Sequence, residues 1–318
     1  MMANKQHYRH FLSNPVAKPP CRMLNANMYG FFVDANTDKM QGYIDDTLNT
    51  LSTTVTSFRV LGHYCLLTFT DIEKISSLTP PFSEQGWMQE TDIIIWLPVA
   101  EIEHQAGEND INHLYWYPAF IAVNNIYALI NGREVWGYNK YLCDYEMPSN
   151  MADLSRFSLS LQCFKHFSPD TKLSHHQLLS ISQAPAAKDE NLLDNIEEFG
   201  NKVARLFRGD PIGIDFSLIK QLLNGFIHPQ MDQILFKQFP DGEADKAVHQ
   251  AVVHSPSEIK KIHAFKLLRN NFQLDVKQLA SFPLFDMFGI ALGLQEVHIP
   301  FYINMDFDQL GATQLLPK

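Results

Sequence analysis

The sequence predicts an α+β fold in which antiparallel strands dominate and helices lie at the periphery. Short apolar runs rich in Val, Ile, Phe, Tyr, Trp and Thr fill the first half of the chain, as is typical of strands. Pro, Asn and Gly bound these runs, which favours strands joined by turns over buried helices. One block, residues 185–228, has instead the apolar period of amphipathic helices.

Six apolar runs in the first half of the chain are expected to be strands. Their sequences are NMYGFFVDA, VTSFRVLGHYCLLTFTDI, TDIIIWLPVAEIE, HLYWYPAFIAVNN, YALINGREVWGY and SRFSLSLQCFKHF. Later, QILFKQFPDGEADKAVHQAVV predicts two strands around a Pro-Asp-Gly turn, and KLLRNNFQLDV another pair around Asn270 and Asn271. The spacing of the runs predicts a mostly antiparallel sheet or barrel.

Residues 191–208 predict one amphipathic helix, because apolar residues recur at helical spacing with acidic residues early and arginines late. We expect its buried face to consist of Leu192, Ile196, Phe199, Val203 and Phe207. A second helix is expected over residues 215–229, ended by Gly225 and Pro229. The helical block is expected to lie outside the sheet, covering it or contributing to a subunit contact.

The chain is expected to form an arm and one domain. Residues 1–27 hold three prolines and few periodic apolar positions, which predicts an N-terminal arm. Residues 28–318 are expected to form a single domain with the helical block at about 185–228 as an insertion. No low-complexity linker marks a second domain.

The composition is that of a folded globular protein with an acidic balance. Of 318 residues, 46% are hydrophobic and 19% charged, and the formal net charge is -10. Nucleic-acid binding needs clustered Lys and Arg, so no nucleic-acid partner is expected. No apolar run approaches the roughly 20 residues of a membrane span, so no membrane partner is expected either. Four widely spaced cysteines and the lack of an apolar signal run predict a cytoplasmic protein.

Common metal, cofactor and nucleophile motifs are absent from the sequence. The 13 histidines include no H-E-x-x-H spacing, and no C-x-x-C pair accompanies them, so no metal is expected. The G-x-S-x-G, G-x-x-x-x-G-K-[ST] and G-x-G-x-x-G patterns are also missing. No cofactor is therefore expected.

The segment INGREVWGYNKYLC, residues 130–143, places a lysine among aromatic residues. Lys140 lies close in sequence to Trp136, Tyr138 and Tyr141 and follows a Gly-Arg-Glu turn. Loss of hydration in such surroundings disfavours the charged amine and is expected to lower its pKa. A lysine of this kind can attack a carbonyl group at neutral pH. The alternative is a strand lysine that points to solvent with its stem on an aromatic neighbour.

This segment resembles a motif of the acetoacetate decarboxylase family. Its order N-N-x-Y-x-L-I-N-G-R-E-V-W-G-Y-N-K is similar to D-N-x-x-A-I-x-x-G-R-E-x-x-G/A-[FY]-P-K-K, which supplies the family's Schiff-base lysine, and Lys140 falls on that position. The resemblance extends upstream to Asp92–Val99 and downstream through LFKQFPDG and PLFDMFGIALGLQEVHIPFYINMDF. It covers about residues 28–308 and implies a closed, cone-like barrel or double sheet with peripheral helices, assembled as a homo-oligomer.

Several positions depart from the family's pattern. Tyr141 stands where a second lysine follows the nucleophile, and Asn139 replaces a proline. Asp92 takes the place of a catalytic glutamate, and a second glutamate would fall near Cys65. The family's N-terminal arginine, expected to meet the substrate carboxylate, has no counterpart in YGFFVDAN. These departures favour relatives that no longer act on acetoacetate.

The resemblance implies a lyase that forms a Schiff base with a keto acid. Decarboxylation of a β-keto acid and aldol addition with dehydration on a 2-keto acid remain open, as does a non-catalytic protein that binds a small molecule or has a structural role. We expect Lys140 and Asp92 to face each other in a cavity, with Asp92 handling protons. Arg133 and Glu134 are expected to be structural supports. On one strand, Tyr138 should share the face of Lys140, while Asn139 and Tyr141 turn away.

Overall fold

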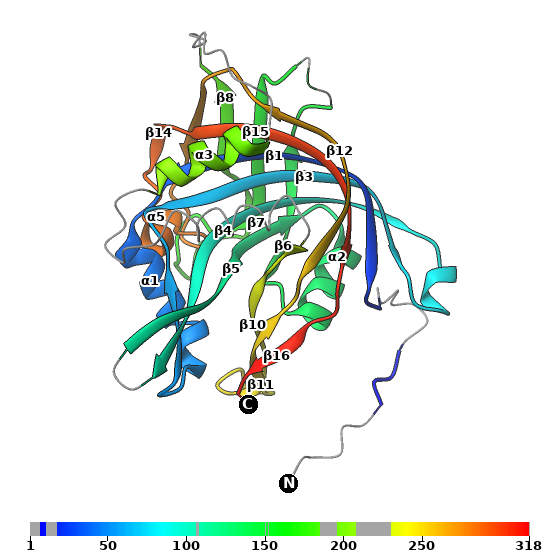
Figure 1. Cartoon of the computed structure of the whole chain (residues 1–318). Coiled ribbons are helices and arrows are strands. Elements are labelled where there is room, and N and C mark those ends of the chain that lie inside the picture. The colour runs from blue at the N-terminus through cyan, green and yellow to red at the C-terminus, as the bar shows by residue number, and fades with distance from the viewer. Residues whose placement is uncertain are drawn as a thin grey trace.

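The computed structural model describes residues 7–10, 18–105, 108–149, 151, 153–184, 196–207 and 230–317. Within these residues the chain forms one large curved sheet of 13 strands and one small sheet (Figure 1). In spatial order the large sheet consists of β14 (Gly293–Glu296), β13 (Phe272–Val276), β8 (Ser174–Gln183), β7 (Arg156–Cys163), β6 (Lys140–Glu146), β5 (Glu108–Val123), β4 (Met88–Gln105), β3 (Tyr64–Ser77), β1 (Cys21–Asp34), β15 (His298–Gln309), β12 (Ser257–Leu267) and β9 (Gln230–Met231), with β2 (Thr56–Val60) paired to β4.

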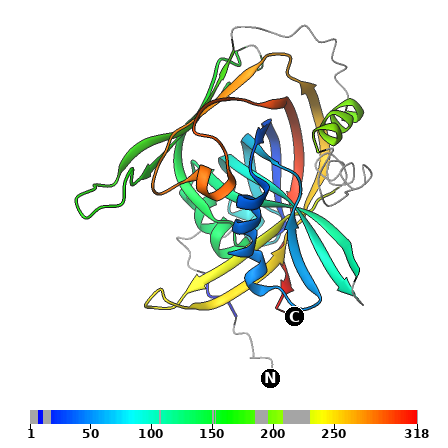
Figure 2. The same cartoon turned by 90° about the vertical axis from the view of Figure 1, so that its left-hand side faces the viewer.

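The small sheet consists of β10 (Ile234–Pro240), β11 (Ala247–His254) and β16 (Thr313–Leu316). Figure 2 shows the hairpin of β10 and β11 extending away from the large sheet. The described helices are α1 (Thr37–Asp45), α2 (Ile126–Asn131), α3 (Ile196–Leu206) and α5 (Leu284–Phe288), with the 3-10 turns η1 (Leu48–Leu51) and η2 (Phe82–Glu84) and the π-helical turn η3 (Gly132–Trp136). The predicted α+β class with mostly antiparallel strands is confirmed.

The predicted closed barrel is wrong for the described residues, because the strands at the two ends of the large sheet, β14 and β9, do not pair with each other. The sheet twists and curls. Its strands β5 and β6 are parallel, so the chain between them must cross over, and α2 with η3 forms this helical crossover. Trp136 of η3 donates a hydrogen bond to the carbonyl of Leu310, just after β15 (2.8 Å).

Both faces of the central strands are buried, which explains their continuous apolar runs. On β4, Ile93, Ile95 and Leu97 belong to one apolar cluster, and the alternate residues Ile94 and Trp96 belong to the other. The second cluster includes the helix α3. Phe199 of α3 packs on Phe301 of β15, with ring centroids 4.8 Å apart. Phe199, Val203 and Phe207 are buried as predicted, whereas Leu192 and the second predicted helix, residues 215–229, lie outside the described residues.

Three local predictions are wrong. The run YALINGREVWGY is not a strand, because residues 126–136 form α2 and η3 after the side chain of Asn125 accepts a hydrogen bond from the N–H of Tyr127 (2.9 Å). The expected arm of residues 1–27 ends earlier, since β1 begins at Cys21. The strands beside Asn270 and Asn271 exist but do not pair with each other. Instead, β12 pairs with β15 and β9, while β13 pairs with β8 and β14.

In the described residues, no helix has both the length and the apolar character needed to cross a membrane.

Candidate active site

Lys140 is the first residue of β6, and its ammonium group lies against two carboxylates. Its Nζ atom donates a hydrogen bond to Oε1 of Glu90 and lies 3.5 Å from Oδ1 of Asp92. Only 9% of Lys140 is exposed, and Glu90 is buried more deeply. The expected cavity position of Lys140 opposite Asp92 is therefore what the geometry shows, and the solvent-facing alternative does not apply.

The strand β4 places both carboxylates on one face. Glu90 and Asp92 are two residues apart, so their side chains leave the strand in the same direction. The parallel pairing of β5 with β6 sets Lys140 beside Ile121, from which the lysine stem extends toward β4. β5 therefore pairs with β4, which carries the two carboxylates, on one side and with β6, which carries the lysine, on the other.

Gly132 allows the helical crossover to pass directly over the lysine stem. A Cβ atom at position 132 would lie 2.6 Å from Cδ and 2.7 Å from Cε of Lys140. These distances are too short for carbon atoms in contact, so glycine is needed here because of the close approach. Gly137, with φ 94°, ends η3 in the left-handed region and lets the chain enter β6.

The pKa of Lys140 is shifted in the direction opposite to the predicted one. Burial alone would lower the pKa of the Lys140 amine, but the negative charges of Asp92 and Glu90 outweigh burial and raise this pKa above its ordinary value. Burial and the neighbouring Glu90 raise the pKa of the Asp92 carboxyl well above its usual range, against the opposing charge of Lys140. The predicted lowering of the Lys140 pKa is therefore wrong, because that prediction considered burial and left out the charges of the two neighbouring carboxylates.

A cavity of about 100 Å³ opens beside these groups on the concave face of the large sheet. Among the described residues that line it, Lys140, Glu90 and Asp92 are the only charged ones. Two buried oxygen atoms at its charged end, Oγ1 of Thr70 and Oδ1 of Asp92, make no hydrogen bond within the described residues. Thr70 is opposite Asp92 in the β3–β4 pairing, so both atoms are available to a bound polar group.

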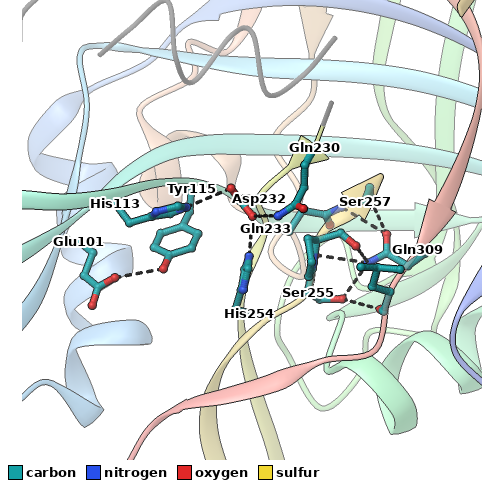
Figure 3. A network of polar contacts seen from close by, with 12 residues as sticks. Glu101, His113, Tyr115, Gln230, Asp232, Gln233, His254, Ser255, Ser257 and Gln309 are labelled. Carbon is teal, nitrogen blue, oxygen red and sulfur yellow. Dashed lines mark hydrogen bonds and ion pairs between the residues drawn. The ribbon is translucent and has the colours of Figure 1, made fainter. Parts of the chain in front are cut away.

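A chain of side-chain hydrogen bonds forms part of the cavity wall, and Figure 3 shows its members Gln233, Ser257, Gln309 and Ser255. The hydroxyl of Tyr138 donates to Oε1 of Gln233 (2.7 Å), and Nε2 of Gln233 donates to Oγ of Ser257 (2.7 Å). Ser257 in turn donates to Oε1 of Gln309 (2.5 Å), whose Nε2 donates to Oγ of Ser255 (2.7 Å). Because each amide is held by its neighbours, this wall is a rigid polar surface rather than a source of protons.

The residue before Gln233 belongs to a separate cluster that joins the two sheets (Figure 3). The carboxylate of Asp232 pairs with Nε2 of His113 on β5 (3.0 Å) and with Nε2 of His254 on β11 (2.7 Å). Burial acts to raise the pKa of Asp232, but the hydrogen bonds from both histidines outweigh it and lower that pKa. The hydrogen bond to Asp232 raises the pKa of His113. None of the three lines the cavity.

The predicted site residues divide between the cavity and other places. Trp136 and Tyr138 line the cavity with Lys140 and Asp92. Tyr141 turns to the opposite face, where it packs on Phe120 and Phe282, and the buried thiol of Cys65 lies in the same apolar cluster. The expected alternation of Tyr138 and Tyr141 therefore holds, although only the residues from Lys140 onward are strand.

Arg133 and Glu134, the expected structural supports, are both exposed, and within the described residues each contacts a different partner. Arg133 donates hydrogen bonds to Oδ1 of Asn139 (3.1 Å) and to the carbonyl of Lys140 (3.3 Å), so it supports the start of β6. Glu134 accepts a hydrogen bond from the hydroxyl of Tyr8 (3.3 Å). Both residues lie on the helical turn η3.

Sequence reasoning missed Glu90 and the amides Gln233 and Gln309. Glu90 could have been found, because it precedes Asp92 by two residues on a predicted strand and must share its face. The glutamines carried no such signal. They reach the cavity from segments far apart in the sequence, and only the tertiary structure brings them together.

The fold and the buried lysine define a protein of the acetoacetate decarboxylase-like fold class. An acetoacetate decarboxylase from Legionella pneumophila matches with a TM-score of 0.59 and 10% identity, over 98% of this chain and 92% of that chain. The enduracididine biosynthesis enzyme MppR in complex with pyruvate matches with a TM-score of 0.54 and 11% identity, over 93% and 90%. An acetoacetate decarboxylase-like enzyme from Sphingomonas wittichii matches with a TM-score of 0.54 and 11% identity, over 98% and 99%.

These structural neighbours are enzymes, and the resemblance to the acetoacetate decarboxylase family is confirmed for the fold. No protein-family profile matches the sequence. No curated protein matches it either.

Proposed function

We propose that this protein is a Schiff-base-forming lyase that acts on a keto acid, with Lys140 as the nucleophile. The observation that carries the proposal is a buried lysine held by two carboxylates at the end of an apolar cavity. A buried amine with a proton acceptor beside it is the arrangement that imine chemistry needs.

Each step of the proposed reaction has a group in position. A neighbouring carboxylate takes a proton from the Lys140 ammonium, and the free amine attacks the substrate carbonyl. The carboxylic acid then returns this proton to the hydroxyl group, which leaves as water, so that a protonated imine remains. For a β-keto acid, the bond to the carboxylate carbon breaks, carbon dioxide leaves and the electron pair moves into the imine to give an enamine. Asp92, whose raised pKa makes it a ready proton acceptor, takes up a proton and delivers it to the enamine carbon. Water hydrolyses the product imine and restores the amine.

Aldol addition with dehydration on a 2-keto acid uses the same enamine and stays within the proposal. The neighbour MppR, which was solved with pyruvate and with the condensation product of pyruvate and imidazole 4-carboxaldehyde, supports keeping this reaction open. Lys140 is the only cation that lines the cavity among the described residues, so no separate cation receives a substrate carboxylate. This feature favours weak activity on acetoacetate.

Borohydride trapping tests the proposal directly. Incubation with acetoacetate or pyruvate and borohydride should attach a mass adduct to Lys140, because reduction fixes an imine as a stable amine. Lys140→Ala should abolish the adduct, while Lys277→Gln, which changes an exposed lysine just after β13, should leave it unchanged. Peptide mass spectrometry locates the adduct.

A non-catalytic binding protein is the second candidate. It is favoured by the raised pKa of Lys140, since a protonated amine does not attack carbonyls. Calorimetric binding of a keto acid without any adduct, across neutral and alkaline pH, would replace the lyase proposal with this one.

A further inference from the structure

A stripe of apolar side chains leads away from Lys140 across five strands of the large sheet. Register pairs place neighbouring residues of the stripe side by side, one from each strand. In order from β4 to β12 the stripe consists of Met88, Ile75, Met23, Phe307 and Ile259. All five line the cavity, and Met88 lies two residues before Glu90 on the same face of β4.

The stripe continues into a second cavity of about 280 Å³ at the surface. The two cavities share Ile75, Met88 and Asn131, so they meet at these side chains. The outer cavity is lined by Trp87 and Tyr127, which are 60% and 43% exposed. Such exposure is unusual for aromatic residues beside a cavity and indicates a surface that a ligand covers.

Trp87 and Tyr127 are the most exposed aromatic residues of the outer cavity. The ammonium of Lys74 lies 5.7 Å from the ring of Trp87, and Phe82 is contacted by the ring of His10, with centroids 4.9 Å apart, and by the ammonium of Lys18 at 5.8 Å. An apolar chain that starts at Lys140 therefore has a continuous path along Ile75 and Met88 to Trp87.

We infer that the substrate is a keto compound with an unbranched aliphatic chain, bound with its carbonyl at Lys140 and its chain along this path. The inference rests on the proposed function and names the substrate class for that site. The charged groups lie at one end, together with Oγ1 of Thr70 and Oδ1 of Asp92, which accept no hydrogen bond within the described residues. A carbonyl and a carboxylate belong at this end. Beyond it the five stripe residues are apolar, and Ile75, Met88, Trp87 and Phe82 continue this surface into the outer cavity, where Ser76, Ser77, Gln85 and Asn131 also form part of the lining. Methionine side chains adapt to a flexible chain.

A longer aliphatic chain on the ligand should therefore increase its affinity. Burial of one methylene group lowers the dissociation constant by about fourfold. Methyl ketones suit the measurement, because they are the products expected of β-keto acid decarboxylation and form the same imine. We expect borohydride adducts of methyl butyl ketone and methyl octyl ketone to form at successively lower ketone concentration than those of methyl ethyl ketone.

Variants along the path separate chain binding from nonspecific partition. Ile75→Trp should block the path and reduce the preference for methyl octyl over methyl ethyl ketone by at least about tenfold, the loss of two buried methylene groups. Trp87→Ala should reduce the preference only for the longest chain. Phe167→Ala removes an exposed aromatic side chain that lines neither cavity and serves as the matched control. A preference that is absent in the native protein, or that persists unchanged in Ile75→Trp, would overturn the inference.

The corresponding secondary alcohols distinguish this inference from the proposed function. They cannot form an imine, so calorimetry measures chain binding alone. Tighter binding of longer alcohols without any ketone adduct would overturn the lyase proposal and retain the chain path. Adducts with every ketone but equal binding of all alcohols would overturn the chain path and retain the lyase.

Discussion

At the scale of single residues, the candidate site is a lysine whose pKa is determined by a balance between burial and two carboxylates. Burial acts to lower the pKa of Lys140, and Asp92 and Glu90 act to raise it and prevail. The protonated amine is thus favoured in the resting protein. The same carboxylates are positioned to remove that proton when a carbonyl group arrives.

Replacement of Asp92 should shift the pH dependence of imine formation. Asp92→Asn removes one of the negative charges that raise the Lys140 pKa, so the neutral amine should form at lower pH. We expect the profile of borohydride trapping to move to lower pH, while turnover falls because the enamine loses its proton donor. Asp275→Asn, on β13, is the matched control. An unmoved trapping profile in Asp92→Asn would contradict this account of the Lys140 pKa.

A methyl group at position 132 should displace the nucleophile. In Gly132→Ala the new Cβ atom would overlap the stem of Lys140, so the amine must move away from Asp92 and Glu90. A displacement of about 1 Å can reduce a reaction rate by about 100-fold, and we expect a loss of this size in adduct formation. Gly42→Ala, in α1, meets no atom within 4 Å and is the control. Circular dichroism checks that both variants fold.

At the scale of elements, the helical crossover and α3 have different tasks. The crossover of α2 and η3 forms part of the cavity wall through Ala128, Gly132 and Trp136. The helix α3 packs on β1 and β15 through Phe199 and Phe207, and neither residue lines the cavity. Stability and reactivity should therefore be separable by mutation.

Truncation in α3 should destabilise the protein without removing its reactivity. Phe199→Ala leaves a hole between α3 and Phe301, and such substitutions cost about 3–5 kcal/mol of unfolding free energy. We expect this loss in urea unfolding, with the Lys140 adduct retained under native conditions. Glu197→Ala changes an exposed residue of the same helix and should have little effect. A loss of adduct in folded Phe199→Ala would show that α3 acts on the site.

At the scale of the whole molecule, the Asp232 cluster joins the small sheet to the large one. His113 comes from β5, His254 from β11, and Asp232 from the segment between β9 and β10. The expected homo-oligomer stays a prediction at this scale, and analytical ultracentrifugation measures it.

Asp232→Asn should lower stability in a pH-dependent way. The lowered pKa of Asp232 contributes stability that is present above its unfolded value, about 4, and is lost as pH falls. The raised pKa of His113 contributes stability that is present below its unfolded value, about 6.5, and is lost as pH rises through the folded value. The stabilisation should thus be greatest between about pH 4 and about pH 6.5, where we expect the variant to lose about 1–2 kcal/mol.

Thermal unfolding across pH measures this effect. Asp144→Asn removes the carboxylate of an exposed pair with His175 and serves as the control, because exposed pairs contribute little. Equal losses at all pH values would show that Asp232 acts through packing rather than through its charge.

The sequence by itself determined the strand-rich fold class, the buried face of α3 and the identity of the central lysine. These features depend on local patterns: short apolar runs between turn residues, helical spacing, and a motif that is contiguous in the chain. The tertiary structure alone decided the rest. The crossover of residues 126–136 became helical because it must connect two parallel strands, and the sheet stayed open because its end strands do not meet.

The pKa of Lys140 shows the same division most clearly. Aromatic neighbours in the sequence predicted a desolvated amine, and the amine is indeed buried. The sign of its pKa shift was decided by Glu90 and Asp92, which lie about 50 residues earlier and reach the amine only because β5 separates and aligns β4 and β6. Desolvation follows from the apolar composition of a segment, whereas the Coulomb interaction depends on distances of a few ångströms, and those distances exist only in the folded chain.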